Sequence, residues 1–257
     1  MALWYETGNG FVKTSFARKG NNCAAFVCCG GPSLNKIDPS IIKGHNRIVF
    51  GLNNTYPFII PDIWIGMDDP YCYHRDIFDR PFPKIMRGGY AKRERESGRV
   101  DGLFNTFYAD CKKPENFEET FTRRAHDVKF VWKKSTLITA LHIIVWMGCR
   151  KIYLFGNDLN NSNGDYFDSV TLSDKFRKRN EKFYKRISNY LWNFKEIGKK
   201  YGIELYSCSE GSAANDFLDY YDYKDVIKDL EKDLPKDYKL YHAVDAEAMW
   251  EKKCKKK

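Results

Sequence analysis

The 257-residue sequence lacks a long apolar run, and nowhere does it approach the roughly 18 consecutive apolar residues that a membrane-spanning helix needs. Its first residues, MALWYE, also lack the order of basic and then apolar residues that marks a signal peptide. We therefore expect a cytosolic protein without a transmembrane segment. Hydrophobic residues at 43% and aromatic residues at 16% indicate a folded globular chain.

The sequence also lacks several motifs that would identify a cofactor. There is no CxxC pair among the eight cysteines and no Cys/His cluster at zinc-ligand spacing, which argues against a structural zinc and a disulfide framework. No Gly-Lys-Ser or Gly-Lys-Thr follows a glycine-rich loop, and no GxGxxG is present. The chain is therefore neither a P-loop protein nor a protein with the usual dinucleotide fingerprint.

Negative charge is in deficit, since the formal net charge is +9. This excess suggests an anionic partner such as a nucleotide, a nucleic acid or a membrane surface. Much of it lies in two clusters, at residues 87–99 and 252–257. Each cluster is also explained by a simpler reading, as a solvated loop and a frayed tail.

The chain does contain apolar segments of strand length, alternating with two helical patterns. Uniformly apolar strands are typical of a parallel sheet that is covered on both faces. We expect strands at 23–29, 47–52, 63–67, 128–132, 151–155 and 203–207, and helices at 135–147 and 176–201. This order predicts one α/β domain over residues 1–257, a Rossmann-like, doubly wound, mostly parallel sheet with helices on both faces.

The predicted core covers about residues 22–217, and two segments depart from its pattern. Residues 70–116 are rich in proline and charge, which predicts an irregular, basic insertion. Residues 220–257 predict one or two peripheral helices broken at Pro235.

The first predicted strand ends in a glycine-rich turn, Gly30, Gly31, Pro32 and Ser33, and we expect a helix to begin near Leu34. Glycines let the backbone approach a ligand, and free N–H groups at a helix N-terminus favour phosphate. Ser33 can cap such a helix or bind an anion. A tight structural turn would need the same glycines, so the ligand interpretation rests on the position at the first strand-to-helix connection.

Polar residues also follow the later strands, at the edge of the sheet where open α/β folds bind ligands. Asn53 follows the second strand, and its amide can both donate and accept hydrogen bonds. Asp68 and Asp69 close the third strand, as a turn cap with ligand contacts or as carboxylates that hold a metal; we favour the cap, and a metal requirement stays open. Ser135 and Thr136 begin a helix, and as a helix N-terminus they predict a second phosphate contact.

The order of these motifs resembles the bacterial sialyltransferases of the Campylobacter type and the wider group of Rossmann-like glycosyltransferases related to flagellar motility accessory factors. The segments that carry the resemblance are GGPSL (30–34), VFGLNNTY (49–56), Ser135-Thr136, MGCRKIYLFGND (147–158), NGDY (163–166) and GIELY (202–206). The resemblance implies a glycosyltransferase that moves a sugar from a nucleotide-sugar donor to a hydroxyl. By position, it implies nucleotide contacts from Gly30, Gly31, Pro32, Ser33, Asn53, Asp69, Ser135, Thr136, Gly156 and Asp158.

The resemblance further implies a lid over about residues 157–193, beginning with Asn163, Gly164 and Tyr166, where tyrosine hydroxyls stabilise the departing phosphate. The family's general base is a lid histidine, but this chain has no histidine between His142 and His242. Inverting transfer needs a base for the acceptor hydroxyl. The candidates at loop positions are Asp158, Asp165, Asp168 and His74, and we place Asp165 and Asp168 first because they flank Tyr166.

Three functions stay open at this point. The first is transfer of a sugar from a nucleotide sugar of unknown base to a glycan or another hydroxyl. The second is a transferase of viral type that decorates hydroxymethylated bases in DNA, which the basic insertion and the basic lid favour. The third is a non-catalytic nucleotide-binding module, which the missing lid histidine favours.

Overall fold

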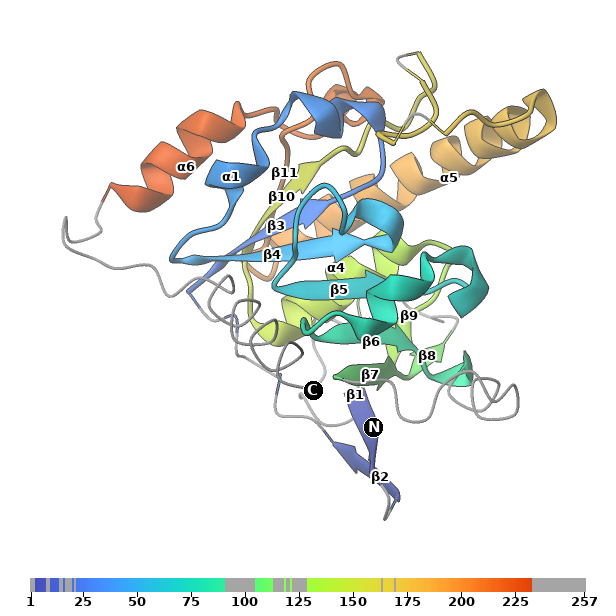
Figure 1. Cartoon of the computed structure of the whole chain (residues 1–257). Coiled ribbons are helices and arrows are strands. Elements are labelled where there is room, and N and C mark those ends of the chain that lie inside the picture. The colour runs from blue at the N-terminus through green and yellow to red at the C-terminus, as the bar shows by residue number, and fades with distance from the viewer. Residues whose placement is uncertain are drawn as a thin grey trace.

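The protein, described by a computed structural model, is built on one twisted sheet (Figure 1). The described residues are 3–7, 10–13, 16, 20, 22–90, 105–112, 118, 121, 129–162, 164–168 and 170–232. Within them the sheet has nine strands in the order β11-β10-β3-β4-β5-β6-β7-β1-β2. The predicted doubly wound α/β fold is confirmed.

The seven strands from β11 to β7 run parallel. They are β3 (Ala24–Cys28), β4 (Arg47–Leu52), β5 (Ile63–Gly66), β6 (Lys84–Arg87), β7 (Thr106–Ala109), β10 (Lys151–Phe155) and β11 (Glu204–Ser207). A hairpin of β1 (Leu3–Thr7) and β2 (Gly10–Lys13) continues the sheet antiparallel to β7. The sheet is therefore mostly parallel, with an antiparallel edge.

Strand β3 lies centrally because both of its faces are apolar. Its five residues are all buried. Ala25 and Val27 pack toward one core, and Ala24, Phe26 and Cys28 pack toward the other. A strand without polar side chains is apolar on both faces, so both faces must be covered by other elements that pack against the sheet.

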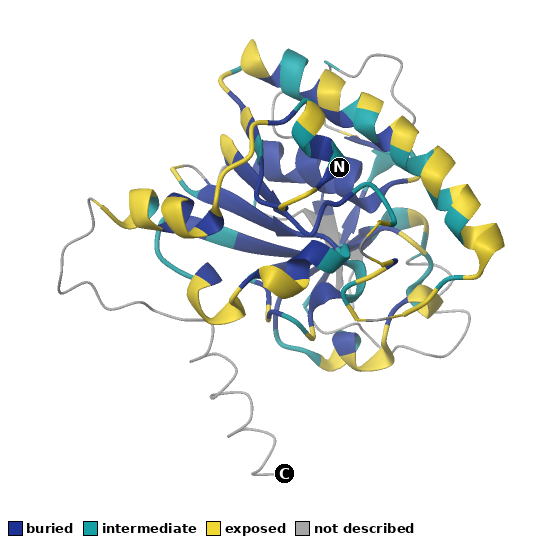
Figure 2. Ribbon diagram, turned by 90° about the horizontal axis from the view of Figure 1, so that it is seen from above, coloured by how far each residue is buried: buried dark blue, intermediate teal, exposed yellow. Residues whose placement is uncertain are grey.

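Helices cover both faces of the sheet. On one face lie α4 (Thr136–Met147) and α5 (Asp174–Lys199), and on the other lie the short α1 (Pro39–Ile42) and α6 (Tyr223–Glu231) (Figure 1). All twelve residues of α4 are buried, with Ser135 as N-cap and Gly148 in the left-handed conformation at its end. Only one face of α5 is buried, so most of its length is exposed in Figure 2.

Two of the predicted elements differ from the structure. Residues 70–116 are not simply an irregular insertion, since β6 and β7 lie there and belong to the main sheet. The strand expected at 128–132 is short, β9 (Phe130–Val131), and pairs with β8 (Cys111–Lys112) in a separate two-stranded sheet. The prediction that it belongs to the main sheet is wrong, because β6 and β7 take the places beside β5.

The structure also corrects the helix predicted near Leu34. The segment Pro32–Lys36 is a single 3-10 turn, and the four residues of α1 follow only after Asp38. A turn of this length has no helix dipole to offer an anion.

Some predictions concern residues outside the described part of the chain. They are Asn163, residues 91–99 of the basic cluster at 87–99, residues 233–257 of the predicted tail and the lysines at 252–257. Among the described residues, no helix is long and apolar enough to cross a membrane.

Substituting Gly156 by Ala tests how tightly the ends of β3 and β10 are packed. Gly156 has a φ of +64°, and a Cβ there would lie 2.4 Å from the backbone oxygen of Cys29. Gly202 has a φ of +67° with no atom within 4 Å of such a Cβ. We expect Gly202→Ala to lower the free energy of unfolding by about 1–2 kcal/mol, the cost of the left-handed backbone alone. Gly156→Ala should lower the free energy of unfolding by at least about twice that amount, because its Cβ would also collide with the backbone of Cys29. Equal urea midpoints for the two variants would contradict this close approach of the two backbones.

Candidate functional site

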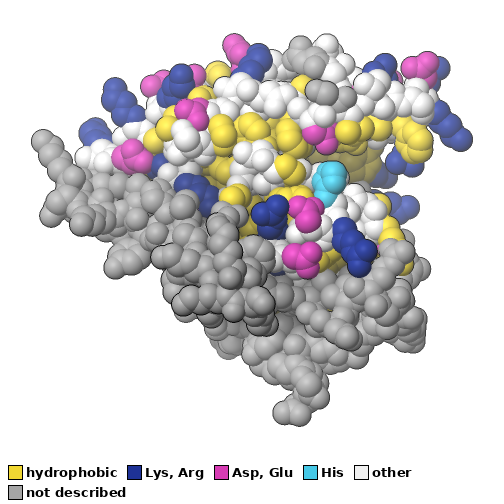
Figure 3. Space-filling model, viewed as in Figure 1, with side chains coloured by type: hydrophobic (Ala, Val, Ile, Leu, Met, Phe, Trp, Pro, Cys, Tyr) yellow, Lys and Arg dark blue, Asp and Glu magenta, His cyan; other side chains and the backbone are white. Residues whose placement is uncertain are grey.

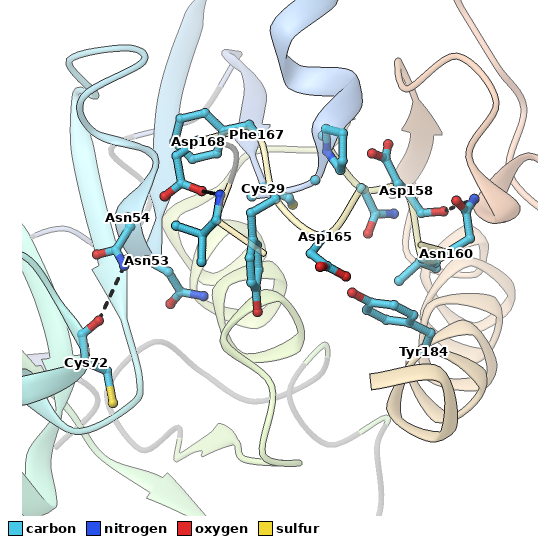
Figure 4. A pocket seen from close by; sticks show the side chains of 18 of the residues that line it. Cys29, Asn53, Asn54, Cys72, Asp158, Asn160, Asp165, Phe167, Asp168 and Tyr184 are labelled. Atoms are coloured by element: carbon cyan, nitrogen blue, oxygen red, sulfur yellow. Dashed lines mark hydrogen bonds between the residues drawn. The ribbon is translucent and has the colours of Figure 1, made fainter. Parts of the chain in front are cut away.

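A pocket of about 390 Å³ opens at the carboxyl edge of the parallel strands (Figure 4). The strand order reverses between β3 and β10, because the chain adds strands on one side of β3 first and on its other side later. The loops that leave these two strands, at residues 29–32 and 156–160, line the pocket. Open α/β sheets bind ligands at such a reversal, where two connections diverge and leave a crevice.

The two loops at this reversal are held together by Asp158. Its carboxylate accepts the backbone N–H of Ser33 at 2.8 Å and also the Ser33 hydroxyl. The N–H of Gly31 donates to the backbone oxygen of Gly156 at 2.8 Å, and a Cβ on Gly31 would lie 2.6 Å from that oxygen. Gly31 is therefore required by the packing of one loop on the other.

This arrangement changes the role of the glycine-rich turn. The N–H and hydroxyl of Ser33, predicted to bind phosphate, are occupied by the carboxylate of Asp158. Ser33 itself is buried and does not line the pocket. Gly30, Gly31 and Pro32 do line it, as do Gly156 and Asp158.

The strands β4 and β5 provide the opposite wall. Asn53 lines the pocket as predicted, together with Asn54, and Figure 4 shows both on the same side as Cys72. Asp69 does not line it, because its side chain caps the following 3-10 turn by accepting the N–H of Tyr71. Its neighbour Asp68 lines the pocket instead.

Three further predicted residues lie elsewhere. Ser135 caps α4 by accepting the N–H of Ile138, and Thr136 is buried in its first turn. Neither residue lines the pocket, nor does His74. The prediction that the start of α4 faces this pocket is therefore wrong.

The loop after β10 and helix α5 complete the pocket with Asp165, Tyr166, Asp168 and Tyr184. In Figure 4 the Asp165 carboxylate and the Tyr184 ring lie close together. Burial, with the nearby Tyr166, Asp165 and Asp158 adding to it, raises the pKa of Tyr184 to about 12. Tyr184 is therefore a hydroxyl donor at neutral pH.

Asp165 is not available as a proton acceptor. Arg177 of α5 approaches both of its oxygens, at 3.0 and 2.9 Å, and the N–H of Leu172 donates to the same carboxylate at 2.8 Å. The hydrogen bonds from Arg177 and Leu172 lower the pKa of Asp165. The ion pair instead ties the loop that carries Tyr166 and Asp168 to the helix that carries Tyr184.

Three carboxylates of the pocket form no ion pair within the described chain: Asp68, Asp168 and Asp158, the last of which is held by Ser33. Asp168 is exposed and, within the part of the chain that the structure describes, accepts a hydrogen bond from the N–H of Val170 alone, at 3.3 Å. Asp68 is exposed at the pocket wall, where the loss of part of its hydration raises its pKa and the positive charge of Arg87 opposes this rise. A carboxylate with a raised pKa and an open face is suited to take a proton.

Two observations indicate that the pocket is built for a polar ligand. Asn157 is 4% exposed, and its side-chain Nδ2 has no hydrogen-bond partner among the described residues, which is costly unless a ligand or water accepts from it. Asn53 and Leu159 also have left-handed backbones, with φ of 52° and 53°. For a leucine this conformation is rare, and such strain often lies at functional sites.

The pocket is acidic. Asp68, Asp158, Asp165 and Asp168 line it, and the residues of its described lining include no lysine, arginine or histidine. No group of three His, Cys, Asp or Glu side chains in the described part of the chain could hold a metal ion. Carboxylates, amides and tyrosine hydroxyls are groups that bind hydroxyl-rich ligands by hydrogen bonds.

The comparisons with known proteins give a likeness of fold. No family model and no curated protein matches the chain. The resemblance predicted from the order of the motifs is confirmed among solved structures. One similar structure is the monofunctional α-2,3-sialyltransferase Cst-I from Campylobacter jejuni, with 12% identity over 84% of each chain and a TM-score of 0.47.

Another is the sialyltransferase CstII from Campylobacter jejuni in complex with cytidine-5′-monophosphate, with 14% identity over 77% of this chain and 84% of that chain and a TM-score of 0.43. At these identities the likeness concerns the fold alone. What the pocket of this chain can do depends on its own residues.

The sequence-based site did not include Asn157 or Tyr184, and it gave the nucleotide contact to Asp69 rather than to Asp68. Asp68 stands beside the predicted Asp69, and only the 3-10 turn decides which of the two faces the pocket. Asn157 lies between the predicted Gly156 and Asp158. Tyr184 could not be identified from spacing, because many residues of the basic helix are equally polar.

Breaking the Arg177–Asp165 pair should lower stability in a pH-dependent way. The pKa of Asp165 is lowered in the folded state, so the pair stabilises the fold above the unfolded pKa of about 3.9. This contribution is lost as the pH falls through the folded pKa. Arg177→Met should therefore reduce the urea midpoint at pH 7, and the difference from the wild type should shrink at pH 3.

Asp165→Asn serves as the matched variant, since it removes the other partner of the same pair. The double variant Arg177→Met/Asp165→Asn should be no less stable at pH 7 than the less stable single variant. Additive losses would mean that the two side chains act independently.

Proposed function

We propose that the protein is a glycosyltransferase that binds a nucleotide sugar in this pocket and transfers the sugar to an acceptor hydroxyl. The observation that carries the proposal is the position of the pocket at the reversal of strand order. Its walls hold an amide without a partner in the described chain, three tyrosines and three carboxylates outside ion pairs. The resemblance of the motif order to bacterial sialyltransferases supports the same reaction class.

The chemistry assigns a different part to each group. The hydroxyls of Tyr166 and Tyr184 and the Nδ2 of Asn157 are neutral donors that can stabilise a departing phosphate. Asp68 or Asp168 accepts the proton of the attacking hydroxyl as the bond between the sugar and the phosphate breaks. Asp158 and Asp165 keep the loops in place and do not take part in proton transfer.

The acidity of the pocket bears on the donor. Every phosphate charge brought into it is repelled by the carboxylates, so a donor with one phosphate charge is favoured over a donor with a diphosphate. We infer a sugar linked to a nucleoside monophosphate. The base stays undetermined, since amide side chains such as those of Asn53 and Asn54 can pair with more than one base.

Donor preference is tested by calorimetric titration of the wild type with a cytidine-monophosphate sugar and with uridine- and guanosine-diphosphate sugars, without added metal. We expect the monophosphate-linked donor to bind at least about tenfold more tightly, since a second phosphate charge costs on the order of 1 kcal/mol or more near a carboxylate. Asn157→Ala should weaken the favoured donor. Tighter binding of a diphosphate sugar would overturn the inference, and binding of no nucleotide sugar would overturn the proposed function.

The base is tested by comparing Asp68→Asn with Asp168→Asn in a turnover assay with the favoured donor. Loss of the base should lower kcat by about 10²–10⁴-fold with little change in donor affinity. Because the pKa of Asp68 is raised, activity that depends on it should fall as the pH drops through a value above the ordinary 3.8. If Asp68→Asn is fully active and keeps the same pH profile, the base is Asp168 or another group.

The same assays separate the alternatives of a non-catalytic module and of a transferase that acts on DNA. Donor binding without turnover across glycan and nucleic-acid acceptors would favour the module. Turnover only with a hydroxymethylated DNA acceptor would favour a transferase that acts on DNA.

A further inference from the structure

The N-terminal half of α5 carries a large excess of positive charge. Residues 174–186 contain seven lysines and arginines and two acidic residues. Figure 3 shows Lys and Arg side chains gathered around the end of this helix, on the right. Six of the seven form no ion pair with any described residue: Lys175, Lys178, Arg179, Lys182, Lys185 and Arg186. Their charge is therefore not neutralised by the described protein.

Aromatic rings alternate with cations along one face of this helix. Phe176, Arg179, Phe183, Arg186 and Tyr190 are spaced by three and four residues, which places them in one row. The guanidinium of Arg179 lies 5.0 Å from the ring centre of Phe176, and that of Arg186 lies 4.9 Å from that of Phe183. At a rise of about 1.5 Å per residue the row is about 21 Å long.

The row continues from α5 to the residues that precede α4 and to the end of β6. The ammonium group of Lys133 lies 5.4 Å from the ring centre of Tyr190. Trp132 precedes Lys133, and the guanidinium of Arg87 lies 5.0 Å from the Trp132 ring. We call the four cations and four rings the cation–aromatic band: Arg87, Trp132, Lys133, Tyr190, Arg186, Phe183, Arg179 and Phe176.

One end of the band lies at the carboxyl edge of the sheet, because Arg87 is the last residue of β6. At the other end, Phe176 is 46% exposed, although Arg179 covers it. A polymer that follows the band would therefore start on an open ring and reach the carboxyl edge of the sheet.

We propose that the cation–aromatic band binds single-stranded nucleic acid. Cations in a row attract the phosphates of a polyanion, and the exposed ring of Phe176 offers a stacking surface to unpaired bases. The rings of Trp132, Phe183 and Tyr190 pack in part against the core and present only their outer edges. An anionic polysaccharide would use the cations but has no bases to stack, and the bases of a duplex are already stacked on one another. Binding to the band does not depend on the proposed sugar transfer, although it would bring an acceptor strand to that pocket.

The test is fluorescence anisotropy of the full-length protein with a fluorescein-labelled oligomer of 20 thymidines, at 50–300 mM salt and without nucleotide sugar. Arg179→Gln/Arg186→Gln is the test variant. Lys224→Gln/Lys228→Gln removes the same charge from exposed positions of α6, on the other face of the sheet. The test variant should bind at least about tenfold more weakly at 50 mM salt, and its salt slope should fall by about 1.4, or about 0.7 for each lost phosphate contact.

The control variant should keep the affinity of the wild type within about twofold. Equal losses in the two variants would mean that net charge alone causes binding, and the proposal would be overturned. It would also be overturned if the wild type did not bind the oligomer at 50 mM salt. Equal thermal midpoints of the three proteins would show that the substitutions have not unfolded α5.

Stacking is tested with Phe176→Ala, at a ring that is largely outside the core. This variant should bind the thymidine oligomer about fivefold more weakly or worse, and its affinity for heparin should not change, because heparin carries charge but no bases. An unchanged affinity for the oligomer, or an equal loss for heparin, would contradict nucleic acid as the occupant. Since no sugar donor is present, the outcome is independent of whether the pocket is a transferase site.

Discussion

The contact between Asp158 and Ser33 is the constraint on which the site depends. It joins the ends of β3 and β10, the two neighbouring strands between which the order of the sheet reverses. A buried hydrogen bond to a charged group stabilises a fold by roughly 1.5–3 kcal/mol, and here one carboxylate accepts two of them. The two loops can approach so closely only because Gly31 and Gly156 have no side chains.

This constraint limits what the glycine-rich turn can offer to a phosphate. The donors that a phosphate would use at Ser33 are satisfied by a carboxylate of the protein itself. What remains open around the turn are neutral donors and further carboxylates. The same loop packing that creates the crevice therefore determines its electrostatic character, and it shifts the expected ligand from a polyphosphate toward a hydroxyl-rich molecule of low charge.

The sequence predicts the centre of the fold better than its periphery. Strands such as β3 and β10 are apolar along most of their length, and this pattern occurs where both faces are covered. In contrast, β6 (KIMR) and β7 (TFYA) have four residues each and carry polar side chains, and they lie among prolines and charges. Their place in the sheet depends on pairing with β5 and β1, and pairing between distant segments has no local signal in the sequence.

The site shows the same limit at the level of single residues. Strand ends could be located from hydrophobicity, so Gly30, Asn53 and Asp158 were correctly placed at one edge. Which of two adjacent aspartates faces the pocket, or whether a carboxylate is already paired, depends on the turns and on distant partners. Asp69 is held by its own turn, and Asp165 by an arginine twelve residues later.

Helix α5 shows how one element can connect these parts, because its sides have different partners. Ile187, Leu191 and Phe194 are buried against the core and fix its position. Nearer its N-terminus, Tyr184 lines the pocket and Arg177 holds the neighbouring loop. Most of the lysines and arginines beside these residues are exposed, so they pack neither against the core nor into the pocket. A charged row that contributes little to folding, on a helix that is rigidly anchored at its other end, is free to serve a partner outside the protein.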